Sequence, residues 1–256
     1  MQPYDARTAL DDIRRLRDRT IDEYLRRSFA FPTTLVTLLL VFLVLASFDL
    51  PNPTAIGVRV SACGGLAGMS AVMATLPIRR AFTSADLGFA VRWAAGPLTA
   101  LLAFRIAAWA LDLPFPMTIA AAATVVIGIA TSPVHRRAYR RLLERAPQAA
   151  PVDPSFSAFL HVPARLSIVA SLDVATWMEA GLLRDMVRIS DSALREELSP
   201  LVQAGHAAIR EGWAMGSGRT YVQVTPMGRR AFHGHVAALE RLAQATSGDA
   251  ARRGVA

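Results

Sequence analysis

The sequence predicts a mainly α protein in two parts: a domain of four transmembrane helices and, after it, a small soluble α+β domain. Charged residues make up 19% of the 256 residues, whereas a soluble domain usually carries about a quarter. The deficit lies between residues 31 and 134, and both flanks of this block are densely charged. We therefore expect a transmembrane domain over 29–135 between two soluble segments.

Four stretches supply the roughly twenty apolar residues that a helix needs to cross a bilayer. They lie near 30–49, 55–77, 87–111 and 116–134. Three arginines fall inside these stretches but close to their ends, where the guanidinium can reach the headgroups, so we interpret them as interfacial anchors. They are Arg59, Arg92 and Arg105.

The arginines outside the spans collect on one side. The connections "DLPNPT" (49–54) and "DLPFP" (112–116) hold none, whereas Arg79 and Arg80 lie between the second and third spans and five arginines occupy 135–145. The positive-inside rule then predicts a multi-pass protein of the inner (plasma) membrane with both termini in the cytoplasm. All basic residues are arginine, which together with the many alanines indicates a GC-rich bacterial genome.

Two helical features leave alternatives open. The leader, residues 1–28, carries apolar residues on one face, so it is either an amphipathic juxtamembrane helix or a solvated helical stub. In the second span, Gly64 and Gly68 form a small-residue pair that lets helices approach closely, either within the bundle or in a dimer. The single cysteine, Cys63, excludes an intramolecular disulfide.

A basic juxtamembrane segment and Pro/Ala linker (136–154) precede the soluble domain (155–246), and a disordered tail is expected over 247–256. The segments "SFSAFLHVPARLSIVASL" and "MEAGLLRDMVRI" predict two helices. Ser190 can cap a third helix that Pro200 is expected to interrupt and Gly205 to end. The inward face of this helix is Leu194, Leu198, Leu201 and Val202.

Two strands, "HAAIREGW" and "RTYVQVT", follow around a glycine-rich turn and predict a hairpin. Thr225 and Pro226 then begin a last helix. The order of three helices, a hairpin and a helix is that of a winged helix-turn-helix domain. The fold class is thus mainly α, a four-helix transmembrane domain with a C-terminal winged helix-turn-helix (α+β) domain.

Four ordered motifs make this more specific. They are His161-Val-Pro163-Ala-Arg165-Leu166-Ser-Ile168, Ser190-Asp191-Ser-Ala-Leu194, Leu201-Val-Gln-Ala204-Gly205 and Arg219-Thr220-Tyr-Val-Gln-Val-Thr225-Pro226-Met-Gly228-Arg229. With these motifs, residues 159–245 resemble the winged-helix domains of the MarR-like superfamily.

The resemblance implies that the third helix enters the major groove and that wing arginines reach the minor groove or phosphates. The expected DNA-binding residues are Arg188, Ser190, Ser192, Arg195, Glu196, Ser199, Arg210 and Arg219. The first and last helices of such domains commonly build a dimer, so 155–173 and 226–245 are candidate dimer surfaces. The expected function is a membrane-anchored transcriptional regulator. Its expected partners are double-stranded DNA, the lipid bilayer, a second copy of the chain and an undefined effector. The membrane domain either senses a ligand or serves only as an anchor.

A second class of function stays open because the domain is weakly basic. Residues 155–245 hold nine arginines and eight acids, and Glu196 with Glu197 would repel phosphates. The alternative is a membrane scaffold whose winged helix binds a cytoplasmic protein. An enzyme is not expected, because no nucleophile–base set or phosphate loop is present, and no cofactor or metal is expected either. His233 and His235, two apart on a helix, point to different faces.

Overall fold

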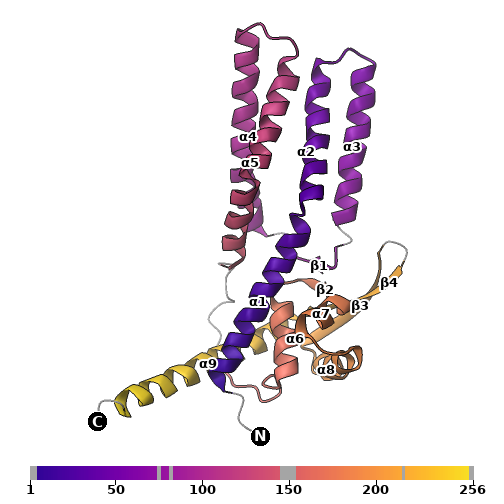
Figure 1. The fold of residues 1–256 in the computed structure, drawn as a ribbon. Coiled ribbons are helices and arrows are strands. Elements are labelled where there is room, and N and C mark those ends of the chain that lie inside the picture. The colour runs from indigo at the N-terminus through magenta and orange to yellow at the C-terminus, as the bar shows by residue number, and fades with distance from the viewer. Residues whose placement is uncertain (1–4, 74–75, 81–82, 145–153, 215–216, 254–256) are drawn as a thin grey trace. The chain divides into compact units, whose positions relative to one another are not determined.

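The computed structural model describes residues 5–73, 76–80, 83–144, 154–214 and 217–253 (Figure 1). The chain divides into two compact units. The helix unit comprises Leu25–Leu76 and Phe82–Glu144, and the α+β unit comprises Met1–Tyr24, Pro77–Ala81 and Arg145–Ala256. The protein is mainly helical, as predicted, with one small antiparallel sheet.

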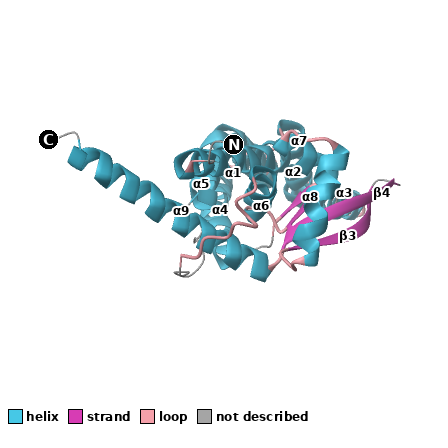
Figure 2. Ribbon diagram, turned by 90° about the horizontal axis from the view of Figure 1, so that it is seen from below, coloured by secondary structure: helices cyan, strands magenta, loops and turns pink. Residues whose placement is uncertain are grey.

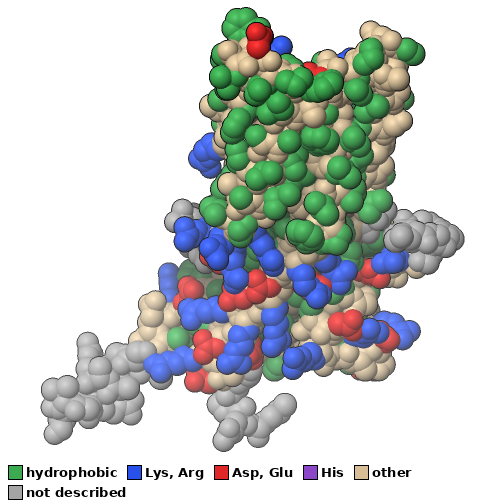
Figure 3. Space-filling model, turned by 45° about the horizontal axis from the view of Figure 1, so that its top comes forward, with side chains coloured by type: hydrophobic (Ala, Val, Ile, Leu, Met, Phe, Trp, Pro, Cys, Tyr) green, Lys and Arg blue, Asp and Glu red, His purple; other side chains and the backbone are tan. Residues whose placement is uncertain are grey.

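The helix unit contains α2 (Phe31–Ala46), the short 3-10 helix η1 (Ser47–Asp49), α3 (Thr54–Met73), α4 (Ser84–Ala110) and α5 (Pro116–Glu144). Among the described residues, four helical segments are long and apolar enough to cross a membrane by length and composition. Large apolar side chains stay exposed on them, among them Val60 and Trp109. Hydrophobic side chains cover most of this unit on the face drawn in Figure 3.

Polar contacts hold the connections between these helices. Asp49 caps α5 from the end of η1, accepting the main-chain N–H groups of Met117 (3.2 Å) and Thr118 (2.6 Å). Arg59 donates to the Ser47 hydroxyl oxygen at 3.0 Å and lies 4.1 Å above the Phe48 ring. The guanidinium of Arg59 is therefore bound within the chain, and its predicted role as a headgroup anchor stays a prediction.

The small-residue face of α3 is only partly used inside the unit. A Cβ built on Gly65 would lie 2.9 Å from Leu40, so this glycine permits the close approach of α2 and α3. A Cβ built on Gly64 or on Gly68 would have no atom of another element within 4 Å among the described residues. Of the two alternatives for this glycine pair, packing within the bundle is therefore not the one that the structure adopts.

The α+β unit contains the expected helices and hairpin. Its C-terminal part runs α6 (Pro163–Asp173), β2 (Trp177–Glu179), α7 (Ala180–Val187), α8 (Asp191–Gln203), β3 (Ala207–Ala214), β4 (Ser217–Val224) and α9 (Pro226–Arg253). β3 and β4 form an antiparallel hairpin from Ala207↔Val224 to Ala214↔Ser217. Figure 2 shows this hairpin beside α8.

Local signals set most of these boundaries. The Ser190 hydroxyl accepts the Ala193 N–H at 3.1 Å, and Gly205, at φ +70°, follows the end of α8. The Thr225 hydroxyl accepts the Gly228 N–H at 3.0 Å and so caps α9. The expected interruption at Pro200 is wrong, because the proline removes one main-chain hydrogen bond while α8 continues to Gln203.

Three further features differ from the predictions. Met178 and Glu179, expected in a helix, belong to strand β2, because Met178 pairs with Val222 and is buried in the core. α9 continues to Arg253, through most of the segment expected to be a disordered tail. α5 continues to Glu144 into the predicted juxtamembrane segment, and the linker over 145–153 lies outside the described residues.

The leader is a helix, α1 (Ala6–Ser28), and most of it belongs to the core of the α+β unit. Ala9, Leu10, Ile13 and Leu16 are buried in one cluster with residues of α6, α8 and α9. The Thr20 hydroxyl oxygen is buried 3.4 Å from the Ser171 carbonyl oxygen of α6. The apolar face of the leader thus packs against the α+β unit of the same chain, and the solvated-stub alternative is wrong.

The loop between α3 and α4 also joins this unit. Its strand β1 (Ile78–Arg79) lies at the edge of a four-stranded sheet of order β1-β2-β4-β3. Ile78 pairs with Met178, and the Glu179 N–H donates to the Pro77 carbonyl oxygen at 2.7 Å. The α+β unit is therefore assembled from three separate segments, not from 155–246 alone.

The predicted dimer surface over 155–173 needs a correction. The apolar residues of α6 are at most 2% exposed within the single chain, since α1 and the domain core cover them; they are Leu166, Ile168, Val169, Ala170 and Leu172. In α9, Phe232 and Leu239 are buried, while Leu242 is exposed. The homodimer itself stays a prediction.

Candidate nucleic-acid interface

Helix α8 presents a polar face to solvent and an apolar face to the core. Leu194, Leu198 and Leu201 are buried, so the inward face is confirmed at these three positions. Val202, also expected to face inward, is 38% exposed. The predicted contact residues on this helix and its cap are all exposed; they are Ser190, Ser192, Arg195, Glu196 and Ser199.

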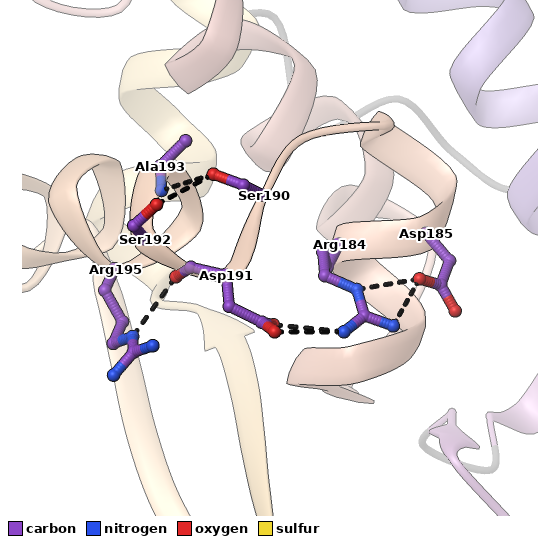
Figure 4. A network of polar contacts seen from close by, with 7 residues as sticks. All are labelled: Arg184, Asp185, Ser190, Asp191, Ser192, Ala193 and Arg195. Atoms are coloured by element: carbon purple, nitrogen blue, oxygen red, sulfur yellow. Dashed lines mark hydrogen bonds and ion pairs between the residues drawn. The ribbon is translucent and has the colours of Figure 1, made fainter.

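An ion-pair network surrounds the N-terminus of α8 (Figure 4). Arg184 of α7 reaches Asp185 at 2.6 Å and Asp191 at 3.2 Å. Hydrogen bonds to Asp185 and then to Asp191 raise the pKa of Arg184. Because two carboxylates compensate one guanidinium, this cluster does not by itself make the helix N-terminus basic.

Two arginines next to this network remain exposed. Arg195 donates from Nε to the Asp191 carbonyl oxygen at 3.2 Å, and Figure 4 shows its guanidinium directed away from the Arg184–Asp191 pair. Arg188 ends α7 in the left-handed conformation at φ 61°. Both cations thus lie at the turn between α7 and α8 or on the first turns of α8, where the sequence places DNA contacts.

The other two predicted arginines are held against strand β2. Arg219 of β4 forms an ion pair with Glu179 at 2.7 Å, and both side chains are half-buried. Arg210 of β3 stacks on Trp177, with its guanidinium carbon 4.3 Å from the ring centroid. These side chains contact the protein in this structure, so the expected phosphate contacts would require them to change partners.

Only one carboxylate of the pair Glu196–Glu197, which was expected to repel phosphates, is neutralised by an ion pair. Glu197 points inward and accepts from Nε of Arg165 on α6 at 2.7 Å. Glu196 alone faces solvent. The objection to phosphate contact therefore rests on one carboxylate of this helix segment.

The histidines of the last helix contact different partners. His233 Nε2 lies 3.0 Å from Asp173, whereas His235 accepts the Ser157 N–H on Nδ1 at 3.1 Å. Burial, and to a lesser degree the neighbouring His161, lowers the pKa of His235 to about 4. Among the described residues, no group of three His, Cys, Asp or Glu side chains could hold a metal ion.

Sequence reasoning missed the compensating partners of these arginines. Asp191 stands seven positions from Arg184, across a turn, and Glu179 stands forty positions from Arg219. Neither distance along the chain carries a periodic signal.

Comparison with known proteins agrees with this geometry. A family model described as a winged helix DNA-binding domain matches residues 164–243. No curated protein and no solved structure gave a significant match. Residues 164–243 thus match a winged helix DNA-binding domain, in agreement with their fold.

Proposed function

We propose that this chain is a membrane-anchored transcriptional regulator of the MarR-like type, which binds double-stranded DNA through α8 and the β3–β4 wing. The observation that carries the proposal is the exposed polar face of α8, with Ser192, Arg195 and Ser199 in a capped helix of a winged helix DNA-binding domain. A helix of this kind fits the major groove, where serine and arginine side chains reach base edges.

Three observations support the membrane anchor. Four helical segments are apolar and long enough to span, and the arginines collect at the same ends of these segments. In addition, α1 and β1 both belong to the α+β unit. If the helices cross a bilayer, the leader and the loop between α3 and α4 must then lie on the same side as the winged helix, as the arginine distribution predicts.

Reporter fusions test this topology. Fusions after residues 52 and 115 are expected to report the outer face, and fusions after residues 82 and 256 the cytoplasmic face. An outer location of the C-terminus would remove DNA as a partner altogether.

DNA binding is best measured on the full chain, because α1 and β1 contribute to the core of the winged helix. The protein is placed in nanodiscs of zwitterionic lipid, since anionic lipid repels DNA, and the preferred site is selected from random duplexes. Arg195→Ala should cost roughly 1–3 kcal/mol on the preferred site and little on other sequences. Glu196→Gln should tighten non-specific binding, because it removes the one exposed carboxylate of the Glu196–Glu197 pair.

Matched controls lie on α9. Arg241→Ala and Glu240→Gln make the same charge changes at exposed positions outside α8 and should leave both affinities nearly unchanged. Equal effects of Arg195→Ala and Arg241→Ala would indicate attraction by net charge alone, with no role for the face of α8.

A second candidate function is favoured by the ion pairs. Arg184 and Arg219 are compensated by carboxylates, and Asp185, Asp191 and Glu196 are exposed around the start of α8. Such a surface could bind a basic segment of a cytoplasmic protein, which is the scaffold alternative. Absence of duplex binding even at low salt, together with capture of one cytoplasmic protein that Glu196→Gln weakens, would replace the regulator by the scaffold.

A further inference from the structure

Strand β2 is the point where the loop between α3 and α4 meets the wing. On one edge it pairs with β1, through Ile78↔Met178 and Arg79↔Trp177. On the other edge it pairs with β4, through Met178↔Val222 and Glu179↔Tyr221. A three-residue strand thus connects the loop strand to the hairpin.

The side chains of β2 hold both wing arginines. Glu179 binds Arg219 at 2.7 Å, and Trp177 stacks on Arg210 at 4.3 Å. The main chain of the same Glu179 donates to the Pro77 carbonyl oxygen at 2.7 Å. The residue that engages the wing arginine is therefore held from two sides, by the loop and by its pairing with Tyr221 of β4.

The attachment of β1 is short but specific. Only two residues pair, yet Ile78 is 4% exposed and belongs to the same core cluster as Met178 and Val222. Along the chain, four residues separate Met73 of α3 from Ile78, and four separate Arg79 from Ser84 of α4.

We propose that β1 is an autoinhibitory strap: while it is paired with β2, Glu179 withholds Arg219 from DNA, and release of β1 raises the affinity of the domain for duplex DNA. The proposal rests on the proposed function and names its regulation. Without β1, β2 becomes an edge strand, and Glu179 keeps its pairing with Tyr221 but loses the hydrogen bond from its N–H to Pro77. A partly exposed ion pair contributes little once its geometry is loose, so Arg219 can then exchange Glu179 for a phosphate.

The test measures binding of the full chain, in zwitterionic nanodiscs, to a non-specific duplex at several salt concentrations. Ile78→Asp places a charge at a buried position and should detach β1. Glu179→Gln leaves β1 in place and weakens only the hold on Arg219. Both variants should raise affinity about threefold to tenfold and steepen the dependence of log K on log salt by about 0.9, as expected for one added phosphate contact.

Adding Arg219→Ala to either variant should remove most of the gain and the added slope. The matched control is Glu211→Gln, which makes the same charge change at an exposed position of β3 and should not steepen the slope. Hydrogen exchange in β3 and β4 checks that each variant is folded. If Ile78→Asp unfolds the unit, Ile78→Ala takes its place as the milder detachment of β1.

The outcomes separate the inference from the function. Wild-type binding that neither variant strengthens, or a gain that persists with Arg219→Ala, overturns the strap and leaves DNA binding intact. A gain with Glu179→Gln but not with a folded Ile78 variant also overturns it, since Arg219 would then be withheld independently of β1. Absence of duplex binding by every variant at low salt overturns the proposed function itself.

Discussion

Truncating one leader residue should destabilise a helix that lies about 150 positions further along the chain. Leu16 of α1 is 7% exposed and belongs to the core cluster that contains Leu166 and Leu172 of α6. A buried Leu→Ala change costs about 2–5 kcal/mol. Because Leu16 keeps some exposure at the margin of the core, we expect about 2–3 kcal/mol for Leu16→Ala.

Hydrogen exchange of the full chain in detergent measures this loss at the amides of α6. A loss of 2–3 kcal/mol in opening free energy corresponds to roughly 30- to 150-fold faster exchange. Arg14→Ala is the matched control on the same helix, because this side chain is 70% exposed and its pair with Asp11 contributes little. Leu10→Ala should accelerate exchange in α6 less when it is added to Leu16→Ala than when it is made alone, because an already detached α1 has no further contact to lose.

The reasoning would be refuted if Leu16→Ala accelerated exchange in α1 but left α6 unchanged. That result would mean that α1 frays independently and that α6 is stable without it. The predicted domain over 155–246 would then be the unit that unfolds cooperatively, without the leader and the loop.

Three further predictions concern the winged helix. Gly228→Ala should cost at least about 3 kcal/mol, because the added Cβ would lie 2.1 Å from the His206 carbonyl oxygen, whereas Gly218→Ala, with no atom within 4 Å, should be nearly neutral in thermal unfolding. Ser190→Ala should cost about 1 kcal/mol through the lost cap, seen as faster exchange in the first turn of α8. His235 has its folded-state pKa lowered to about 4 from the ordinary 6.5, so the unfolded state binds the proton more tightly. The free energy of unfolding should therefore fall by up to about 3 kcal/mol between pH 6.5 and 4, with no further loss from this group below pH 4, and His235→Gln should remove this part of the pH dependence in urea titrations.

The features that could be predicted from the sequence are those set by local chemistry. A hydroxyl cap before an apolar period marked the start of α8, and Gly205 marked its end. The threonine–proline pair marked the start of α9, and two alternating runs around glycines marked the hairpin. The four long apolar helices followed from the length of weakly charged sequence alone, whereas their crossing of a membrane stays a prediction.

The features that could not be predicted depend on partners far apart in the chain. The apolar face of α1 shows that the leader must bury something, but it does not name α6. A two-residue strand such as β1 is too short to show an alternating hydrophobic pattern, and the position of Ile78 beside two arginines predicts a basic loop. The electrostatics of the interface depended on ion pairs such as Arg219–Glu179, so an arginine count overstated the charge available for phosphates.

The three-segment assembly has a consequence for the order of folding. The core of the winged helix needs Leu16 from the leader and Ile78 from the loop, and both are synthesised before α6. If α2 to α5 span the membrane, both segments reach the α+β unit only when the spans have inserted with the leader and the loop on one side. A chain in which one of these spans failed to insert would place the leader or the loop on the opposite side from α6. That would leave α6 uncovered or β2 as an open edge, which is a state prone to aggregation and proteolysis. Insertion of all four spans and a folded winged helix are therefore coupled, and a charged substitution that prevents one span from inserting should lower the amount of folded C-terminal domain.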